Sequence, residues 1–153
     1  MVTSQMEHVA ATLRTFGPSH ERWARAVLVA LHSPRDLTTV ASWAQVAGAS
    51  ETRLRTWCRL ARSRTKASLD LARILRALLT TSGLPGADPA DALDVADDRT
   101  LRSLLRKAGL AGVPPSEWSI GLVLRGHRLA IDRRAITALA LAMGVDPPPT
   151  MSE

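Results

Sequence analysis

Apolar residues recur along this chain every three to four positions, the spacing that places them on one face of an α-helix. No useful length of the sequence alternates polar and apolar residues with the period of two that half-buried strands show. Residues that can cap a helix, and glycines, stand at the ends of these periodic stretches. They predict helices over about 4–16, 19–33, 38–47, 50–61, 65–81, 97–108 and 132–143, with a short helix beginning at 88 and a further helix beginning at 114. We therefore expect a compact all-α fold.

Composition limits the possible classes of protein. The 153 residues suffice for one domain with its own core, and a content of 46% hydrophobic and 22% charged residues excludes a disordered chain. A single cysteine, Cys58, excludes an intramolecular disulfide framework and a cysteine-based zinc site. The longest apolar stretch, 138–145, is far shorter than the roughly 18 residues that a membrane span needs, and the N-terminal residues do not have the pattern of a secretory signal. We expect a cytoplasmic protein without a membrane partner.

The net charge of +6 is unevenly distributed. Residues 53–76 hold eight cations and one acid, a net charge of +7, whereas the rest of the chain holds 12 cations and 13 acids. A localised basic segment is typical of a surface that contacts phosphates, although a solvated helix face gives the same pattern. Five aspartates between 88 and 98 form an acidic cluster that would repel a polyanion.

The strongest local motif lies in residues 40–57, VASWAQVAGASETRLRTW, which predict a helix-turn-helix. Ala44 is small enough for a second helix to cross closely, Gly48 tolerates the positive φ of a tight turn, and Ser50 can cap the second helix. That second helix has an inward stripe of Leu54, Trp57 and Ala61.

The opposite face of this helix is polar and cationic, as a helix in the major groove of DNA requires. The residues expected to contact bases are Thr52, Arg55, Thr56 and Arg59. Each arginine could pair with guanine O6 and N7, whereas the usual asparagine–adenine contact is impossible because the chain has no asparagine. The residues expected to contact phosphates are Gln45, Arg53, Arg62, Arg64 and Lys66.

With these residues, the sequence resembles the DNA-binding domain of the AraC/XylS-type transcription regulators. Residues 68–79, SLDLARILRALL, match the family's linker-helix pattern at Leu69, Arg73, Ile74 and Ala77, and LRKAG (105–109) followed by GVPPSEW (112–118) is similar to its closing signature. The resemblance implies two helix-turn-helix units, about 38–61 and 88–109, joined by a long linker helix over 65–81. They lie within a domain of 18–125, flanked by an amphipathic helix in 1–17 and by a helix and proline-rich tail in 126–153.

The second unit departs from the family pattern. No glycine turn precedes Asp98, and Arg62-Ser63-Arg64-Thr65 replaces the Gly-x-Ser-Pro that follows the first recognition helix in the family. The resemblance implies that Arg99, Arg102, Ser103 and Arg106 face outward on a second recognition helix. Because five acids lie just upstream, a structural subdomain without base contacts is an equal alternative.

We therefore expect a sequence-specific regulator that binds double-stranded DNA through the helix 50–61. The alternative is a helical protein-interaction module that has lost DNA recognition and binds a partner, or itself, through its terminal helices. The apolar residues of those helices are Met6, Val9, Leu13 and Phe16, and Ile136, Leu139 and Met143, for all of which core packing is the simpler explanation.

Other combinations of residues do not indicate catalysis. The four histidines lack metal-ligand spacing, and Ser63-Arg64-Thr65-Lys66 matches S-x-x-K without its companion motifs. Cys58 lies near Arg55, Arg59 and Arg62, which fits a redox-sensitive thiol, but a small core residue is the simpler explanation. We expect no enzymatic activity, metal or cofactor.

Overall fold

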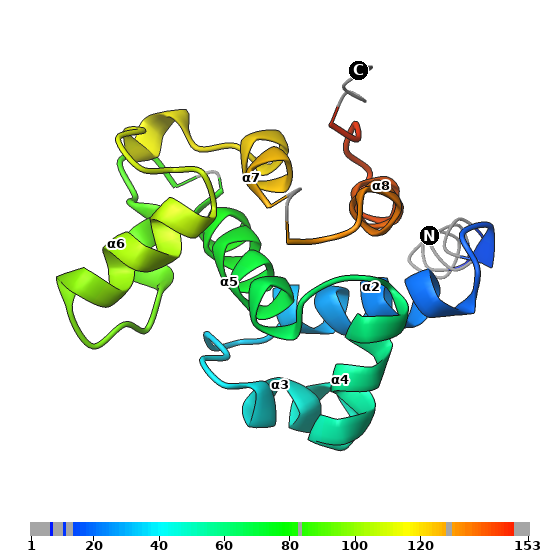
Figure 1. Ribbon diagram of the computed structural model, residues 1–153. Helices are drawn as coiled ribbons and strands as arrows, with labels where there is room; N and C mark the ends of the chain where they lie inside the picture. The colour runs from blue at the N-terminus through cyan, green and yellow to red at the C-terminus, as the bar shows by residue number, and fades with distance from the viewer. Residues whose placement is uncertain (1–6, 8–10, 12–13, 83, 128–129, 149–153) are drawn as a thin grey trace.

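The computed structural model describes residues 7, 11, 14–82, 84–127 and 130–148, and these residues form a helical protein without a β-strand (Figure 1). The all-α prediction is thus confirmed. The α-helices are α2 (Pro18–Leu31), α3 (Val40–Ala47), α4 (Glu51–Leu60), α5 (Thr65–Thr81), α6 (Asp98–Lys107), α7 (Ile120–Gly126) and α8 (Arg133–Ala142), with single 3₁₀ turns at η1 (Pro89–Ala92) and η2 (Pro115–Glu117). Most of the helix predicted over 4–16, including Met6, Val9 and Leu13, lies outside the described residues.

Helix boundaries follow the capping chemistry of the sequence closely. Thr39 and Ser42 form a reciprocal capping box at the start of α3, and the Ser50 Oγ accepts the Arg53 N–H at 3.1 Å at the start of α4.

Two predictions of where a helix begins were wrong. Helix α2 begins at Pro18, one residue before the predicted Ser19, because proline fits the first turn of a helix. The segment after Pro114 forms only η2, and α7 instead begins after Ser119, whose Oγ accepts the Leu122 N–H.

Helix α5 lies at the centre of the molecule (Figure 1) and is buried on all sides from Ser68 to Ala77. Helices α2, α3, α4 and α7 and the turn η1 all pack against it. The two fully buried indoles have their N–H groups satisfied: Trp23 donates to the Ser68 Oγ and Trp43 to the Ala26 carbonyl, each at 2.9 Å. The core is therefore built around the predicted linker helix.

Helix α8 belongs to this same core. It packs along α2, and Ile136 and Leu139, two of the residues considered for a partner interface, are buried there at 3% and 0% exposure. At its start, Asp132 accepts the Arg134 and Ala135 N–H groups and lies 3.2 Å from the His20 Nε2 of α2. The apolar residues of α8 thus pack inside the molecule. This agrees with core packing, the simpler of the two explanations considered for them.

Helices α6 and α7 meet at their C-terminal ends with almost no space between the two backbones. A Cβ added to Gly126 would collide with the carbonyl group of Ala108, which follows α6. Gly121, near the start of the same helix, has open space around its Cα. Gly126 therefore lets α6 approach the core, whereas Gly121 has no such packing role.

A first prediction follows from these two glycines. Gly126→Ala should lower the free energy of unfolding by about 1–3 kcal/mol, because the backbone of Ala108 must move. Gly121→Ala is the matched control and should be neutral or slightly stabilising, since alanine favours a helix. Urea denaturation followed by circular dichroism measures both, and equal effects of the two variants would contradict the close packing.

One buried histidine gives the fold a pH dependence. His127, 3% exposed, directs its Nδ1 at the Val123 carbonyl (3.0 Å), while its Nε2 is buried without a hydrogen-bond partner among the described residues. Burial lowers the pKa of His127 below its ordinary value of 6.5, and the Val123 hydrogen bond and the Asp70 carboxylate offset this only in part. The folded protein thus holds the neutral ring.

A second prediction concerns this ring. As pH falls below about 6.5, the unfolded chain takes up a proton at this position before the folded chain does, so the free energy of unfolding should decrease. A tenfold difference in proton affinity between the two states contributes about 1.4 kcal/mol. Urea denaturation at pH 7.5 and pH 5.5 measures the decrease, which His127→Gln should reduce. An equal pH dependence of wild type and variant would argue against the neutral buried ring.

Candidate nucleic-acid interface

Helices α3 and α4 are joined by a tight turn of Gly48, Ala49 and Ser50. Gly48 has φ 71° and ψ 32°, the left-handed conformation that was predicted for it. The Ala49 N–H donates to the Ala44 carbonyl at 3.0 Å, which closes the end of α3. Ala44 is 2% exposed and Leu54 of α4 is fully buried, so the two helices are fixed against the core.

The outer face of α4 presents the residues expected to contact bases. Thr52, Arg55 and Arg59 are exposed, and Thr56 is half-buried with its hydroxyl donating to the Thr52 carbonyl at 2.9 Å. Arg55 lies 3.8 Å from the carboxylate of Glu51 one turn earlier, and both side chains are more than half exposed. A pair of this kind contributes little to stability, so the Arg55 guanidinium remains available to a ligand.

The inner face of α4 differs from the prediction at one residue. Leu54, Cys58 and Ala61 are fully buried, but Trp57, expected to be core, is only half-buried, and the Arg53 guanidinium lies over its ring at 5.7 Å from the centroid. Burial raises the pKa of the Cys58 thiol despite hydrogen bonds from Thr65 and Ser68 and the charge of Arg55. Cys58 is therefore a core residue rather than an accessible thiolate.

The residues expected to contact phosphates all lie on the surface, but their charges are not equally free. Gln45, Arg53, Arg62, Arg64 and Lys66 are exposed. The Lys66 Nζ lies 3.1 Å from Oδ1 of Asp70, a carboxylate that is 3% exposed on the next turn of α5. Part of the Lys66 charge thus compensates a buried acid instead of facing solvent.

Fewer cations of the basic segment 53–76 reach the surface than the sequence suggests, because the last two arginines of the segment are buried. The Arg73 guanidinium pairs with both carboxylate oxygens of Asp36, at 2.8–3.2 Å, and donates to the Asp94 carbonyl. Arg76 donates to the carbonyls of Ser33, Pro34 and Ala92. The interpretation of all eight cations as one phosphate-facing stripe is therefore wrong, and six remain exposed.

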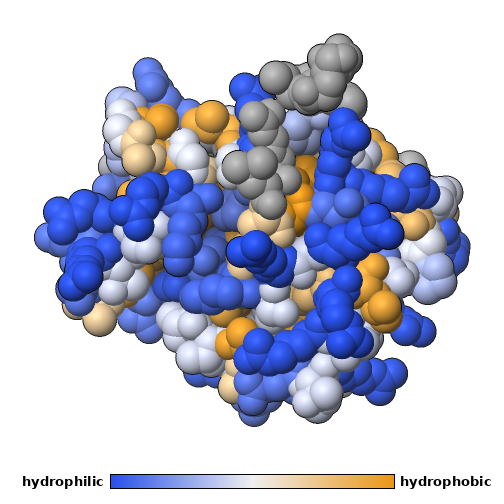
Figure 2. All heavy atoms as spheres, in the orientation of Figure 1, coloured by the Kyte–Doolittle hydropathy of each residue, from blue (hydrophilic) through white to orange (hydrophobic). Residues whose placement is uncertain are grey.

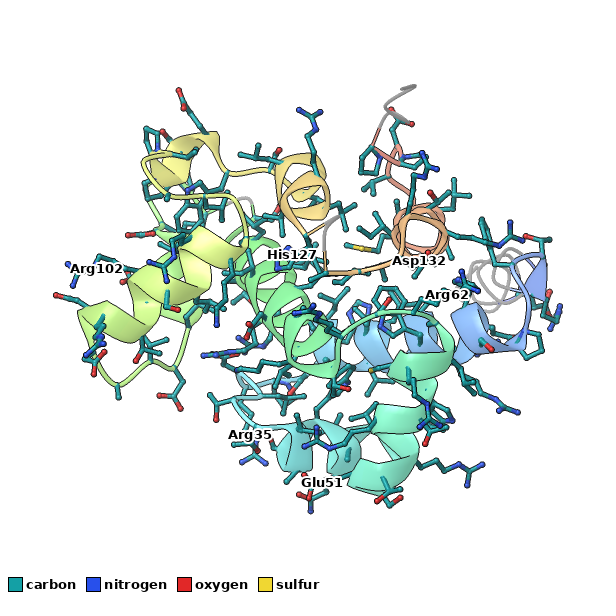
Figure 3. The ribbon with its side chains drawn as sticks, in the orientation of Figure 1. Arg35, Glu51, Arg62, Arg102, His127 and Asp132 are labelled. Carbon is teal, nitrogen blue, oxygen red and sulfur yellow. The ribbon has the colours of Figure 1, made fainter. Side chains whose placement is uncertain are left out.

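Helix α6 carries the second set of expected contacts on its surface. Arg99, Arg102 and Arg106 are exposed and Ser103 is half-buried. Figure 3 shows Arg102 at the left of the molecule and Glu51 of α4 at the bottom. Hydrophilic side chains cover α6 on the face shown in Figure 2. The element before it is the single turn η1. Asp97 accepts the Thr100 N–H at 2.8 Å, and this hydrogen bond lowers the pKa of Asp97, so a carboxylate stands at the start of α6.

Sequence reasoning missed one feature of this surface, a basic pocket beyond the C-terminal end of α4. The pocket has a volume of about 560 Å³ and is lined by Arg59, Arg62, Ser63, Arg64 and Thr65 on one side and by residues 130–133 on the other. Figure 3 shows Arg62 and Asp132 at this junction. Arg133 could not be found from local spacing, because about 70 residues separate the two sides of the pocket.

Comparisons with known protein families, curated proteins and solved structures find no significant match to this chain. Within the described part of the chain, no helix has the length and apolarity to cross a membrane, and histidine, cysteine and acidic side chains do not gather in groups of three or more that could hold a metal. The function must therefore be inferred from the exposed cationic surface.

A third prediction tests the structural role of the buried arginines. Arg73→Met should lower the free energy of unfolding by about 3–5 kcal/mol, because Asp36 would be left buried without its counter-charge. Adding Asp36→Asn should restore part of this loss. Arg125→Met, an exposed arginine of α7, should change stability by less than about 0.5 kcal/mol. Chemical denaturation measures all three, and a small effect of Arg73→Met would contradict the buried pair.

Proposed function

We propose that this protein binds double-stranded DNA in a sequence-specific manner and acts as a transcription regulator, with α4 in the major groove. The observation that carries the proposal is the outer face of α4, where Thr52, Arg55 and Arg59 are exposed on a helix whose other face is fixed in the core. The tight turn between α3 and α4 supports the interpretation of these helices as a helix-turn-helix.

Base recognition on this surface relies on guanidinium chemistry. Arg55 and Arg59 each offer two parallel N–H groups, which match O6 and N7 of guanine. The methyl groups of Thr52 and Thr56 suit the C5-methyl of thymine. Arg53, Arg62 and Arg64 flank this face and would contact phosphates, which fix the register of the helix on the duplex but do not select a sequence. A guanine-containing site follows from this chemistry.

The order of elements supports the proposed AraC/XylS-type relationship. Two helices joined by a tight turn are followed by the long helix α5 and then by α6, with α4 and α6 on different sides of α5 (Figure 1). The single turn η1 stands where a first helix of the second unit would be needed. Together with the exposed acids Asp91, Asp94, Asp97 and Asp98 beside α6, this favours α4 as the main DNA-recognition helix.

A fourth prediction tests DNA recognition directly. Selection from a random duplex library should yield an enriched site, and fluorescence anisotropy then measures affinity for that site and for an unrelated duplex. Arg55→Ala should weaken binding to the selected site by about 1–3 kcal/mol and leave the unrelated duplex nearly unaffected, since it removes a base contact. Arg64→Ala should weaken both duplexes and reduce the salt dependence, since it removes a phosphate contact.

Arg125→Ala is the matched control, because this exposed arginine lies on α7, away from α3 and α4 in Figure 1, and should change neither affinity. Absence of binding tighter than micromolar at about 100 mM salt, or binding indifferent to Arg55, would refute the proposal. Capture of a protein partner that resists nuclease treatment, without any enriched duplex, would instead favour a protein-interaction module.

A further inference from the structure

The basic pocket beside α4 has two walls that are joined by backbone hydrogen bonds. The first wall is the junction between α4 and α5, and the second is the segment that leads into α8. The Arg64 N–H donates to the Ala130 carbonyl at 3.0 Å, and the Asp132 N–H donates to the Ser63 Oγ at 3.3 Å. The pocket is therefore held open by the fold itself and does not need a ligand to form.

Four guanidinium groups line the pocket without a side-chain partner in the described part of the chain. Arg59, Arg62, Arg64 and Arg133 are exposed and make no side-chain hydrogen bond or ion pair with any residue that the structure describes. The single carboxylate in the lining, Asp132, directs its Oδ2 to the N–H groups at the start of α8 and to His20. Like charges are thus concentrated in a concave site with no counter-charge dedicated to them, which favours an anionic ligand.

The start of α5 lies at the same pocket. Arg64 and Thr65 line it, and no side chain caps this 17-residue helix. Its first N–H groups are therefore free to donate to an anion, and the helix dipole favours negative charge there.

Arg62 occupies a backbone conformation that normally selects glycine. It has φ 55°, the one positive φ of a residue other than glycine in the described part of the chain, at the position just after the end of α4. The conformation ends α4, since the Arg62 N–H donates to the Arg59 carbonyl and the Ser63 N–H to the Cys58 carbonyl, each at 2.9 Å. A residue with a Cβ at this position is less stable than glycine. This backbone conformation places the Arg62 side chain in the lining of the pocket.

We propose that this pocket binds a phosphate group, held by Arg59, Arg62, Arg64 and Arg133. The phosphate belongs either to the DNA backbone next to the bases that α4 contacts, an assignment that rests on the proposed function, or to a free phosphorylated ligand. In the first case α8, through Arg133, extends the DNA interface beyond the predicted helix-turn-helix.

Arg62→Gly and Arg133→Ala test the site in the full chain, with Arg125→Ala as control. Calorimetry measures binding of tripolyphosphate, and anisotropy measures binding of the selected duplex and of an unrelated one over a range of salt concentrations. Arg62→Gly should raise the midpoint of thermal unfolding, because it relieves the positive φ, and should weaken ligand binding roughly threefold to tenfold. Loss of affinity in a more stable protein cannot result from unfolding.

The ligand sources give different outcomes. If the phosphate is a DNA phosphate, Arg133→Ala should weaken both duplexes and reduce the slope of log K against log salt by about 1. If it is a free ligand, Arg133→Ala should weaken tripolyphosphate alone, and this result supports the pocket even when no duplex binds. Asp132→Asn keeps the cap of α8 and should tighten binding. Affinities for all probes that are unchanged in Arg62→Gly and Arg133→Ala would overturn the proposal.

Discussion

Two buried arginines on one face of α5 hold the segment before α3 and the segment before α6 against the central helix. Arg73 pairs with Asp36 from the loop between α2 and α3, while the Asp94 N–H, just before α6, donates to the same carboxylate at 2.7 Å. Arg76, three residues later, donates to carbonyls from the same two segments. A buried guanidinium needs most of its five donors satisfied, so these segments have little freedom to move. The network therefore helps to position α3 and α6, which follow these two segments.

The cations of the basic segment 53–76 therefore have two different roles: some face solvent, and others form buried structural contacts. Helix α4 is covered on one side only, so Arg55 and Arg59 extend into solvent, whereas α5 is surrounded by other helices, so Arg73 and Arg76 must find partners inside. Burial of an unpaired charge is far too costly for any other arrangement. Lys66 lies between these extremes, with an exposed stem and an ammonium group beside a buried carboxylate. Charge density along a sequence overestimates the charge that a ligand meets.

The junction between α4 and α5 is where the proposed base and phosphate contacts come together. Arg59 ends the outer face of α4 and also lines the basic pocket, so a phosphate held there would lie next to the bases that α4 contacts. Arg62 accepts a left-handed backbone at this junction where glycine would be more stable. The protein is therefore less stable with Arg62 than it would be with glycine at this position, although the Arg62 side chain has no partner within the described protein.

Most of the helices could be predicted from the sequence, because their signals are local: Ser50 as a cap, Gly48 as the left-handed residue, and the apolar spacing that placed Leu54 inward and Arg55 outward. Which cations are free could not be predicted in this way, because it depends on the packing of segments far apart in the chain. Asp36 and Arg73, 37 residues apart, form one ion pair, and Arg133 lies across a pocket from residues about 70 positions earlier. Trp57 falls on the apolar stripe of α4 but lies at the edge of the core. Periodicity fixes the face of a helix on which a side chain lies, but the surroundings of that face depend on how distant segments pack.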